Sequence, residues 1–348
     1  MDYSPGLRGV IAGETQISTV GMEGTSLRYR GYDAVGLTNT NTYEDVASLI
    51  IDDDLDGELF KKSFSNHYKK LSEDSGLIEL INRLKTEQHP MDVTRTAISY
   101  IGEANESNKL DAASKVTAIA CLAIASYNKE SSDVLDQTYT VASSLLPNSS
   151  TEQQLEALDD MLILYAEHGF NASTFAARVT ASTRSDLISA IVSGVGTLKG
   201  ELHGGANEAA VELINSFKTP EDAKNGVYQL LEDKKKIMGF GHGVYKIQDP
   251  RSPVVKNWVE VLSTSEESIN KYEIAKTIDS IMDSEKKLFP NVDFYGGLLL
   301  SELGFAVDVF TPIFVAGRSV GWSAHYFEQR NQDTLIRPAA KYTGIQER

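Results

Sequence analysis

Residues 236 to 253 read Lys-Ile-Met-Gly-Phe-Gly-His-Gly-Val-Tyr-Lys-Ile-Gln-Asp-Pro-Arg-Ser-Pro. His242 lies among three glycines, and Arg251 follows nine residues later with Asp249 close by. Three glycines within five positions disfavour a helix or strand interior and let backbone N–H groups approach a ligand closely. The segment therefore predicts a loop in which a neutral imidazole and a fixed cation face one small anion. A loop whose histidine only bonds nearby carbonyls is the simpler alternative, because glycine patterns alone are weak signals.

The pairing of histidine with glycine recurs along the chain. Of the six histidines, three directly precede a glycine at predicted junctions between helix and loop: His168, His203 and His242. The glycine after His168 is a helix stop, so His168 is expected at the C-terminal end of a helix over 152 to 167. His203 is expected near the N-terminus of the next helix, where the helix dipole lowers its pKa and keeps it neutral. The repetition favours a functional role over scattered core histidines.

Length and composition describe a globular protein with room for a deep cleft. With 348 residues, the chain suits two domains, or one large domain carrying a smaller one. Apolar residues make up 41% and charged residues 24%, and no apolar run approaches the length of a membrane span. The N-terminus has no pattern of a secretion signal, so a cytoplasmic location is expected. The single cysteine, Cys121, lies in an apolar run and is expected to be buried and unreactive.

The chain is strongly acidic, with a net charge of −16 and an isoelectric point near 4.9. It therefore lacks the surplus of lysine and arginine that a nucleic-acid binder needs. An acidic protein that binds an anion must gather its positive groups locally, so arginines isolated in apolar or glycine-rich segments become candidate binding residues. Three arginines meet this description: Arg251, Arg318 and Arg337.

Helical periodicity dominates from residue 43 onward and predicts an all-α fold. Short β pieces with glycine turns are expected only over residues 6 to 36. A helix is expected to start at Pro90, and the tail from 334 to 338 is expected to be extended. Further helices are expected over the ranges 110 to 127, 152 to 167, 173 to 182, 187 to 198, 220 to 236, 265 to 288 and 312 to 329.

Other ligand motifs are weak or absent. Residues 52 to 58 resemble the first half of a calcium loop, but Ser63 stands where the closing glutamate belongs, which favours a solvated turn. Gly194 and Gly196 lie within a predicted helix, whereas a dinucleotide fingerprint follows a strand. The sequence has no zinc spacing, phosphate-binding loop or serine-nucleophile motif, so neither a metal nor a cofactor is expected.

Asp293 lies beside aromatic and apolar residues at the predicted head of a helix over 298 to 303, where a helix N-cap is one interpretation. Burial, however, raises the pKa of a carboxylate and makes it a better base. With neutral imidazoles such as those of His203 and His242, it suits removal of a proton next to a carbonyl. Arginines would hold a dicarboxylate electrophile by paired hydrogen bonds. Together these groups predict carbon–carbon bond formation through an enol.

Over its whole length the chain resembles a citrate synthase of the shorter bacterial and archaeal kind. The resemblance rests on these motifs in this order: Gly6-Leu7-Arg8-Gly9-Val10, residues 27 to 33, His89-Pro90-Met91-Asp92-Val93, residues 167 to 174, residues 202 to 208, residues 239 to 242 with Asp249-Pro250-Arg251, Asn291-Val292-Asp293, Arg318, and Leu335-Ile336-Arg337-Pro338. It implies a helical fold of two domains. The large domain would comprise residues 1–204 and 297–348, and a smaller mobile lid would comprise residues 205–296.

The resemblance also implies a role for each matching residue. Asp293 would take a methyl proton from acetyl-CoA, His203 would hydrogen-bond the thioester oxygen, and His242 would protonate the oxaloacetate carbonyl, after which citryl-CoA is hydrolysed. The residues that bind oxaloacetate would be His168, His242, Arg251, Arg318 and, from the neighbouring subunit of a homodimer, Arg337. The residues that contact CoA would be Leu202, Ile237, Met238, Gly239, Phe240, Gly241, Lys246 and Asn291.

Two departures fall near the expected CoA loops, where Glu201 and Gly243 replace a proline and an arginine that are common in such enzymes. The implied function is condensation of acetyl-CoA with oxaloacetate and water to citrate. A 2-methylcitrate synthase, which uses propionyl-CoA in the same fold, fits the same residues. A non-catalytic regulatory homologue is a third alternative, which the intact set of His203, His242 and Asp293 opposes.

Overall fold

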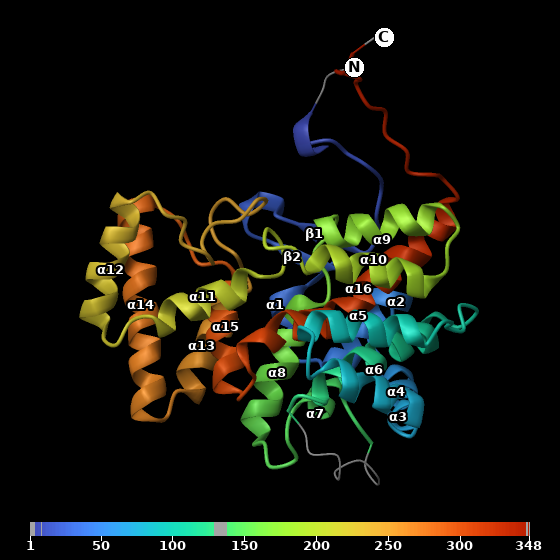
Figure 1. Cartoon of the computed structure of the whole chain (residues 1–348), viewed down its shortest axis with the longest axis horizontal. Helices are drawn as coiled ribbons and strands as arrows, with labels where there is room; N and C mark the ends of the chain where they lie inside the picture. The colour runs from blue at the N-terminus through green and yellow to red at the C-terminus, as the bar shows by residue number, and fades with distance from the viewer. Residues whose placement is uncertain (1–3, 8, 129–137, 346, 348) are drawn as a thin grey trace.

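The computed structural model describes residues 4–7, 9–128, 138–345 and 347, so Arg8 of the first motif lies outside the described residues. Helices dominate the described chain and surround one long central helix, α16 (Phe310–Gln332) (Figure 1). The all-α fold class predicted from the sequence is therefore confirmed.

The N-terminal segment forms the short β pieces that its glycine turns predicted. The strands make one antiparallel sheet in the order β1 (Ser18–Val20), β2 (Leu27–Tyr29) and β3 (Tyr32–Asp33). Two 3-10 turns accompany them, η1 (Pro5–Leu7) and η2 (Met22–Gly24).

The sheet is tied to the end of α8 (Glu152–Tyr165) by one tyrosine. The buried hydroxyl of Tyr29 donates to the backbone carbonyls of Ile163 and Glu167 at 3.0 and 3.1 Å. Because His168 comes next in the chain, this contact positions one of the candidate site residues.

The helices that precede residue 200 pack around α16. In chain order they are α1 (Ala34–Thr38), α2 (Tyr43–Asp52), α3 (Glu58–Ser72), α4 (Ser75–Leu84), α5 (Pro90–Tyr100), α6 (Lys109–Ala125), α7 (Val141–Leu145), α8, α9 (Ala172–Ser182) and α10 (Leu187–Leu198). The helix start expected at Pro90 agrees with α5, and the helices expected between residues 110 and 198 agree with α6, α8, α9 and α10 to within two residues at each end.

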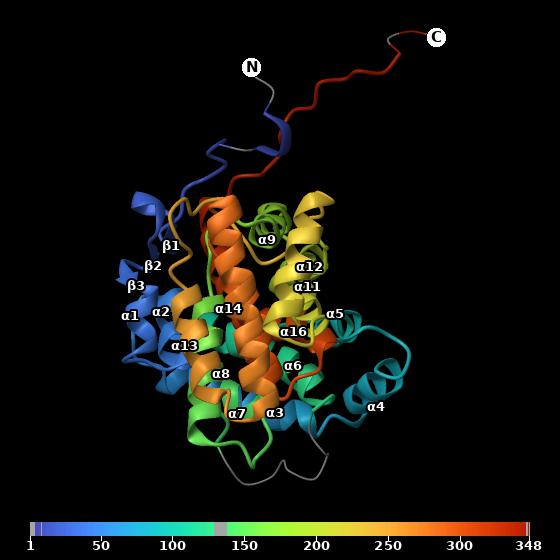
Figure 2. The same ribbon diagram turned by 90° about the vertical axis from the view of Figure 1, so that its left-hand side faces the viewer.

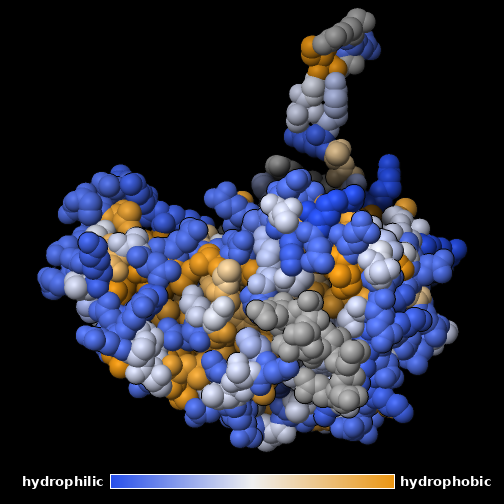
Figure 3. All heavy atoms as spheres, turned by 60° about the horizontal axis from the view of Figure 1, so that its bottom comes forward, coloured by the Kyte–Doolittle hydropathy of each residue, from blue (hydrophilic) through white to orange (hydrophobic). Residues whose placement is uncertain are grey.

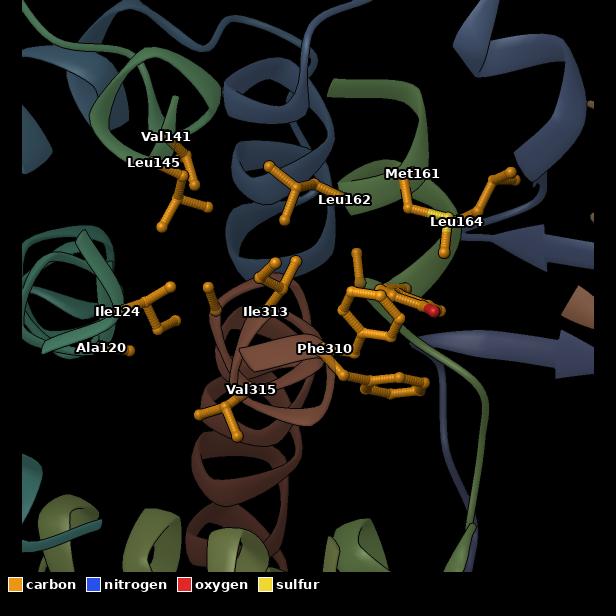
Figure 4. Packing of buried hydrophobic residues seen from close by; sticks show 14 of the residues in the cluster. Ala120, Ile124, Val141, Leu145, Met161, Leu162, Leu164, Phe310, Ile313 and Val315 are labelled. Atoms are coloured by element: carbon orange, nitrogen blue, oxygen red, sulfur yellow. The ribbon is translucent and has the colours of Figure 1, made fainter. Parts of the chain in front are cut away.

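α16 is buried over most of its length because its first eighteen residues carry no charge apart from Arg318. It packs against α2, α6, α8, α9 and α10. Figure 4 shows its Ile313 near Leu162 of α8 and near Ile124 of α6, all fully buried. Each such side chain removed from water contributes about 1.5–3 kcal/mol. The core therefore fixes the one helix that carries Arg318.

Residues 205 to 302 form a second group of helices to one side of α16 (Figures 1 and 2). They are α11 (Ala206–Asn215), α12 (Pro220–Glu232), α13 (Ser252–Leu262), α14 (Glu266–Lys286) and α15 (Val292–Glu302), followed by the turn η3 (Val307–Val309). α11 packs on α15, α12 on α14, and α13 on α15. A mobile lid over 205–296 stays a prediction, although its limits fall close to this group.

The acidic loop over residues 52 to 58 forms a turn. The carboxylates of Asp54 and Asp56 accept the backbone N–H groups of Asp56 and Glu58. No group of side chains in the described chain is suited to a metal ion. Cys121 is buried, as its apolar surroundings predicted.

The face of the molecule shown in Figure 3 carries mostly hydrophilic side chains, with smaller hydrophobic patches between them. The segments that lead to the two termini leave the body on the same side (Figures 1 and 2). Among the described helices, none has the length and apolar character needed to cross a bilayer.

Candidate active site

One cleft of about 700 Å³ collects the titratable groups that the sequence singled out. Its walls come from the segments 168–171, 202–206, 236–244 and 291–293 and from the first half of α16. Six of the predicted side chains line it: His168, His203, His242, Arg251, Asp293 and Arg318. Groups far apart in the chain thus meet in one concave site, as binding and catalysis require.

Asp293 is the second residue of α15, but it does not cap the helix. Asn291 is the N-cap, and its side-chain oxygen accepts the Asp293 N–H at 3.0 Å. The N-cap interpretation of Asp293 is therefore wrong. Within the described chain no donor bonds the Asp293 carboxylate, and burial raises its pKa to about 6, although Arg251 opposes the shift. A carboxylate in this state can serve as a base near neutral pH.

His203 lies in the turn between α10 and α11. Its Nε2 is 3.2 Å from the backbone nitrogen of Ser173, which can only donate, so Nε2 must be the unprotonated nitrogen. The ring proton therefore sits on Nδ1. Burial, followed by the charge of Arg318, lowers the pKa of His203 to about 4. This low pKa agrees with the neutral state predicted for His203, but burial rather than the helix dipole is the main cause of the shift.

His242 has the opposite arrangement. Its Nδ1 accepts the backbone N–H groups of Val244 and Tyr245 at 3.0 and 3.3 Å, so its proton sits on Nε2. Burial lowers the pKa of His242 to about 4, helped by Arg251. Positive φ angles of 85° and 72° at Gly239 and Gly241 shape the loop in front of it, which explains the glycines of that stretch.

His168 is 8% exposed and lies two residues beyond the cap of α8. Gly169 follows it with a φ of 57°, which confirms the predicted helix stop. The Nε2 of His168 is 3.0 Å from the hydroxyl of Tyr245. Burial, together with Arg251, His242 and Arg318, holds its pKa well below the usual value, so all three imidazoles of the cleft are neutral.

Arg251 is held in place by Asp249, as their closeness in the sequence suggested. The Asp249 carboxylate accepts Nε and Nη2 of Arg251 at 2.9 and 2.8 Å and is itself fully buried. It also accepts the backbone N–H of Val292 at 3.0 Å, next to Asp293. Asp249 thus joins the guanidinium to the head of α15.

Arg318 leaves more of its donors free. Its Nε donates to the carbonyl of Tyr165 at 2.6 Å, and neither terminal nitrogen has a partner within the described chain. The side chain is 1% exposed in the isolated chain. Two adjacent free N–H groups can bind a carboxylate in the bidentate geometry that guanidinium favours.

The residues predicted to contact CoA lie along the same cleft, with one exception. Leu202, Ile237, Met238, Gly239, Phe240, Gly241 and Asn291 line it. Lys246 does not, and its Nζ bonds the carbonyl of Gly243 at 3.1 Å. Gly243 also lines the cleft, and a side chain there would meet only open space. Gly243 therefore contributes neither a side chain nor a charge to the wall of the cleft.

Arg337 lies apart from the other predicted residues. It belongs to the exposed segment after α16 and does not line the cleft of its own chain. This placement agrees with a contribution to another subunit, which stays a prediction.

Comparison with known proteins places the chain among relatives over nearly its full length. A family model described as "Citrate synthase, C-terminal domain" matches residues 6–339. The chain belongs to the citrate synthase family.

Two curated relatives and one solved structure show what this citrate synthase family member is similar to. A 2-methylcitrate synthase of Shewanella oneidensis is 41% identical, covering 99% of this chain and 95% of the relative. A citrate/2-methylcitrate synthase of Bacillus subtilis is 35% identical, covering 98% and 96%. The structure of Thermoplasma acidophilum citrate synthase, solved as a ternary complex, is matched at a TM-score of 0.89 and 28% identity, covering 100% of this chain and 97% of that chain.

 The two ligands of that Thermoplasma complex are carboxymethyl coenzyme A and oxaloacetate.

Two contacts of this citrate synthase family site were not foreseen from the sequence. The backbone N–H of Ser173 sets the tautomer of His203, and the hydroxyl of Tyr245 bonds His168. Ser173 lies within one of the quoted motifs, so the motif gave a signal that the residue mattered, although not how. Tyr245 lies within the glycine-rich stretch, where a large aromatic residue needs a packing partner, but the sequence does not reveal which one.

Proposed function

We propose that the chain condenses a short-chain acyl-CoA with oxaloacetate and water, with propionyl-CoA as the preferred donor and 2-methylcitrate as the product. The observation that carries the reaction class is the meeting of an unpaired carboxylate, Asp293, with two imidazoles of fixed tautomer, His203 and His242, in one cleft. The choice of propionyl-CoA rests on the similarity to the Shewanella enzyme.

Proton removal is the first step of the proposed reaction. Asp293 takes a proton from the carbon next to the thioester carbonyl, and His203 donates Nδ1–H to the oxygen on which negative charge develops. A neutral imidazole suits this role because the pKa of its N–H group lies closer to that of the enol oxygen than the pKa of a strong acid does. One such donor is typically worth about 3 kcal/mol of transition-state stabilisation.

Carbon–carbon bond formation follows. The enol carbon attacks the keto carbon of oxaloacetate, and the keto oxygen receives a proton from Nε2 of His242. The product thioester is then hydrolysed to release CoA and the tricarboxylate. This proposal includes no metal or cofactor.

The positive groups of the cleft suit the dicarboxylate substrate. Arg318 offers two free terminal nitrogens and Arg251 offers Nη1, while Asp249 holds the rest of the Arg251 guanidinium in place. Alignment of two reactants can supply about 7–11 kcal/mol of the barrier reduction, so these arginines rival the acid-base groups in importance.

The assembly and location remain parts of the proposal. Residues 205–296 would close as a lid over oxaloacetate, and Arg337 would reach the cleft of a second copy in a homodimer. The structure of the Thermoplasma citrate synthase holds carboxymethyl coenzyme A and oxaloacetate, which supports a CoA thioester and oxaloacetate as the two substrates of this proposal. The expected location is the cytoplasm.

A citrate synthase that prefers acetyl-CoA is the second candidate, favoured by the Thermoplasma structure and by the Bacillus relative, whose name includes both activities. The two acyl groups differ by one methylene, which a pocket discriminates by roughly 10- to 200-fold. A non-catalytic homologue is disfavoured because Asp293, His203 and His242 lie together and are in the protonation states that the reaction needs.

The test is release of the CoA thiol in the presence of oxaloacetate, with kcat/KM measured for propionyl-CoA and acetyl-CoA. We expect release with both and a kcat/KM about tenfold higher for propionyl-CoA. A higher value for acetyl-CoA would establish the citrate synthase alternative. Absence of release with either would support the non-catalytic reading.

A further inference from the structure

Tyr245 lies behind the cleft and contacts three of its predicted oxaloacetate-binding groups. Its side chain is 1% exposed and is not part of the cleft wall. Its hydroxyl is 3.0 Å from Nε2 of His168, and its ring centre is 4.5 Å from that of His242. The guanidinium carbon of Arg251 lies 5.8 Å from the same ring centre. One buried phenol thus joins groups from two separate segments of the chain.

The hydrogen bond between Tyr245 and His168 can run in two directions. His168 is neutral, because burial and the cations around it hold its pKa well below the usual value, so only one ring nitrogen carries a proton. Within the described chain the Tyr245 hydroxyl bonds no other group, and the one other polar group that acts on the His168 ring is the residue's own backbone carbonyl, on the Nδ1 side.

Only one direction satisfies both groups. If Nε2–H donated to Tyr245, the phenol proton would have no acceptor, and the lone pair of Nδ1 would face the carbonyl oxygen of His168 itself. A buried donor without a partner costs about 1–3 kcal/mol. If Tyr245 donates to Nε2, the phenol is satisfied and the imidazole proton stays on Nδ1, where the His168 carbonyl and an anionic ligand beside it can both accept it.

We infer that Tyr245 is a positioning residue, whose hydroxyl donates to Nε2 of His168 and thereby keeps the imidazole proton on Nδ1 for oxaloacetate. This inference rests on the proposed function, since it names oxaloacetate as the ligand. It differs from a purely structural role, in which Tyr245 would only fill space behind the loop of His242 and Arg251.

Tyr245→Phe tests the inference, because it removes the hydroxyl and keeps the ring. Tyr326→Phe is the matched control. Tyr326 is also 1% exposed, and its hydroxyl bonds Glu106 and Ser185 outside the cleft. Both variants lose a buried hydroxyl bond, so both are expected to lower the unfolding temperature by a similar amount.

The first readout is the ¹⁵N spectrum of histidine-labelled protein without substrate, in which protonated and unprotonated ring nitrogens are well separated. With six histidines in the chain, loss of signals in His168→Asn identifies those of His168. We expect an unprotonated Nε2 in the unaltered protein and in Tyr326→Phe. In Tyr245→Phe the proton should move to Nε2 or divide between the two nitrogens.

The second readout is the Kd of oxaloacetate by calorimetry. We expect about a 5- to 15-fold weaker Kd for Tyr245→Phe, the size of one hydrogen bond, and a change of less than about twofold for Tyr326→Phe. The kcat at saturating oxaloacetate should change less than the Kd. An unchanged tautomer with an unchanged Kd in Tyr245→Phe would overturn the inference, as would an equal loss of affinity in both variants.

The two readouts separate failure of this inference from failure of the proposed function. If the unaltered protein neither binds oxaloacetate nor releases thiol, the proposed function fails, whereas the tautomer of His168 is still measured in the free protein. A protonated Nε2 in the unaltered protein would overturn the inference even if the enzyme were active.

Discussion

At the residue scale, His203 and His242 carry their protons on opposite ring nitrogens because different backbone donors bond them. Ser173 N–H bonds Nε2 of His203, and Val244 N–H bonds Nδ1 of His242. No substitution except one by proline removes a backbone N–H donor, so both tautomers are fixed by the fold. Each imidazole then presents one N–H group to the substrates of the proposed reaction.

The pKa values predict a simple pH dependence. Asp293 must be ionised to accept a proton, and burial raises its pKa to about 6, so kcat/KM for the acyl-CoA should rise with pH through about 6 and then level off. His203 and His242 have pKa values lowered to about 4, so they should add no step between pH 5 and 8. Initial rates at saturating oxaloacetate would check this. An acid-side step near pH 7, or no step at all, would contradict the assignment.

The sequence predicted most of the site at this scale, but not its contacts. The order of the motifs picked out the six side chains that line the cleft, and Asp249, noted only as a neighbour of Arg251 in the sequence, pairs with it in the structure. The role of Asp293 stayed ambiguous because a carboxylate at a helix start can cap it. In the structure Asn291 takes that place.

At the element scale, α10 packs closely on α16 because Gly194 of α10 presents no side chain to Trp322 of α16. A Cβ on Gly194 would lie 3.1 Å from ring atoms of Trp322, whereas a Cβ on Gly196 would meet nothing within 4 Å. The indole nitrogen of Trp322 donates to Ser173 Oγ at 3.2 Å, so this packing reaches the neighbours of His203.

The two glycines give a matched prediction. Gly196→Ala should stabilise the protein by about 0.5–1 kcal/mol, because alanine is a better helix former and has room. Gly194→Ala should destabilise it by about 1–3 kcal/mol, because the added methyl overpacks a buried contact. Urea unfolding of both variants measures the difference. Equal stabilities would show that α10 and α16 are not packed as described.

The sequence showed which long segments are helical more readily than it showed where helices end or where short helices lie. The periodic helices α6, α8 and α10 were found, but α13 was missed because Pro253 reads as loop punctuation. In the structure this proline occupies the first turn of α13, where its missing N–H costs nothing. α14 was predicted closely, since its amphipathic period continues over its full length.

At the scale of the whole molecule, the described chain holds all but two of the predicted binding residues in one cleft. The two exceptions are Lys246 and Arg337. Sequence similarity can indicate that Arg337 belongs to the site, but a single chain has no means of showing which copy it serves. Its place on the exposed segment after α16 leads to a test of the proposed homodimer.

Mixing two inactive variants tests whether Arg337 crosses to a second subunit. In a mixed dimer of Arg337→Ala and Asp293→Asn, the cleft of the Arg337→Ala chain keeps Asp293 and would receive Arg337 from its partner. Random pairing should then restore about a quarter of the unaltered activity, since half the dimers carry one complete site. No recovery after co-refolding would mean that Arg337 serves its own cleft or none.

The central claim is that Asp293 removes the proton from the acyl-CoA in a cleft that already holds oxaloacetate. The most direct measurement compares Asp293→Asn with the unaltered protein, using thiol release from propionyl-CoA and acetyl-CoA together with calorimetric binding of oxaloacetate. We predict a loss in kcat of about 10²- to 10⁴-fold with the Kd of oxaloacetate changed by less than about twofold. Turnover within tenfold of the unaltered enzyme, or loss of oxaloacetate binding, would contradict the claim.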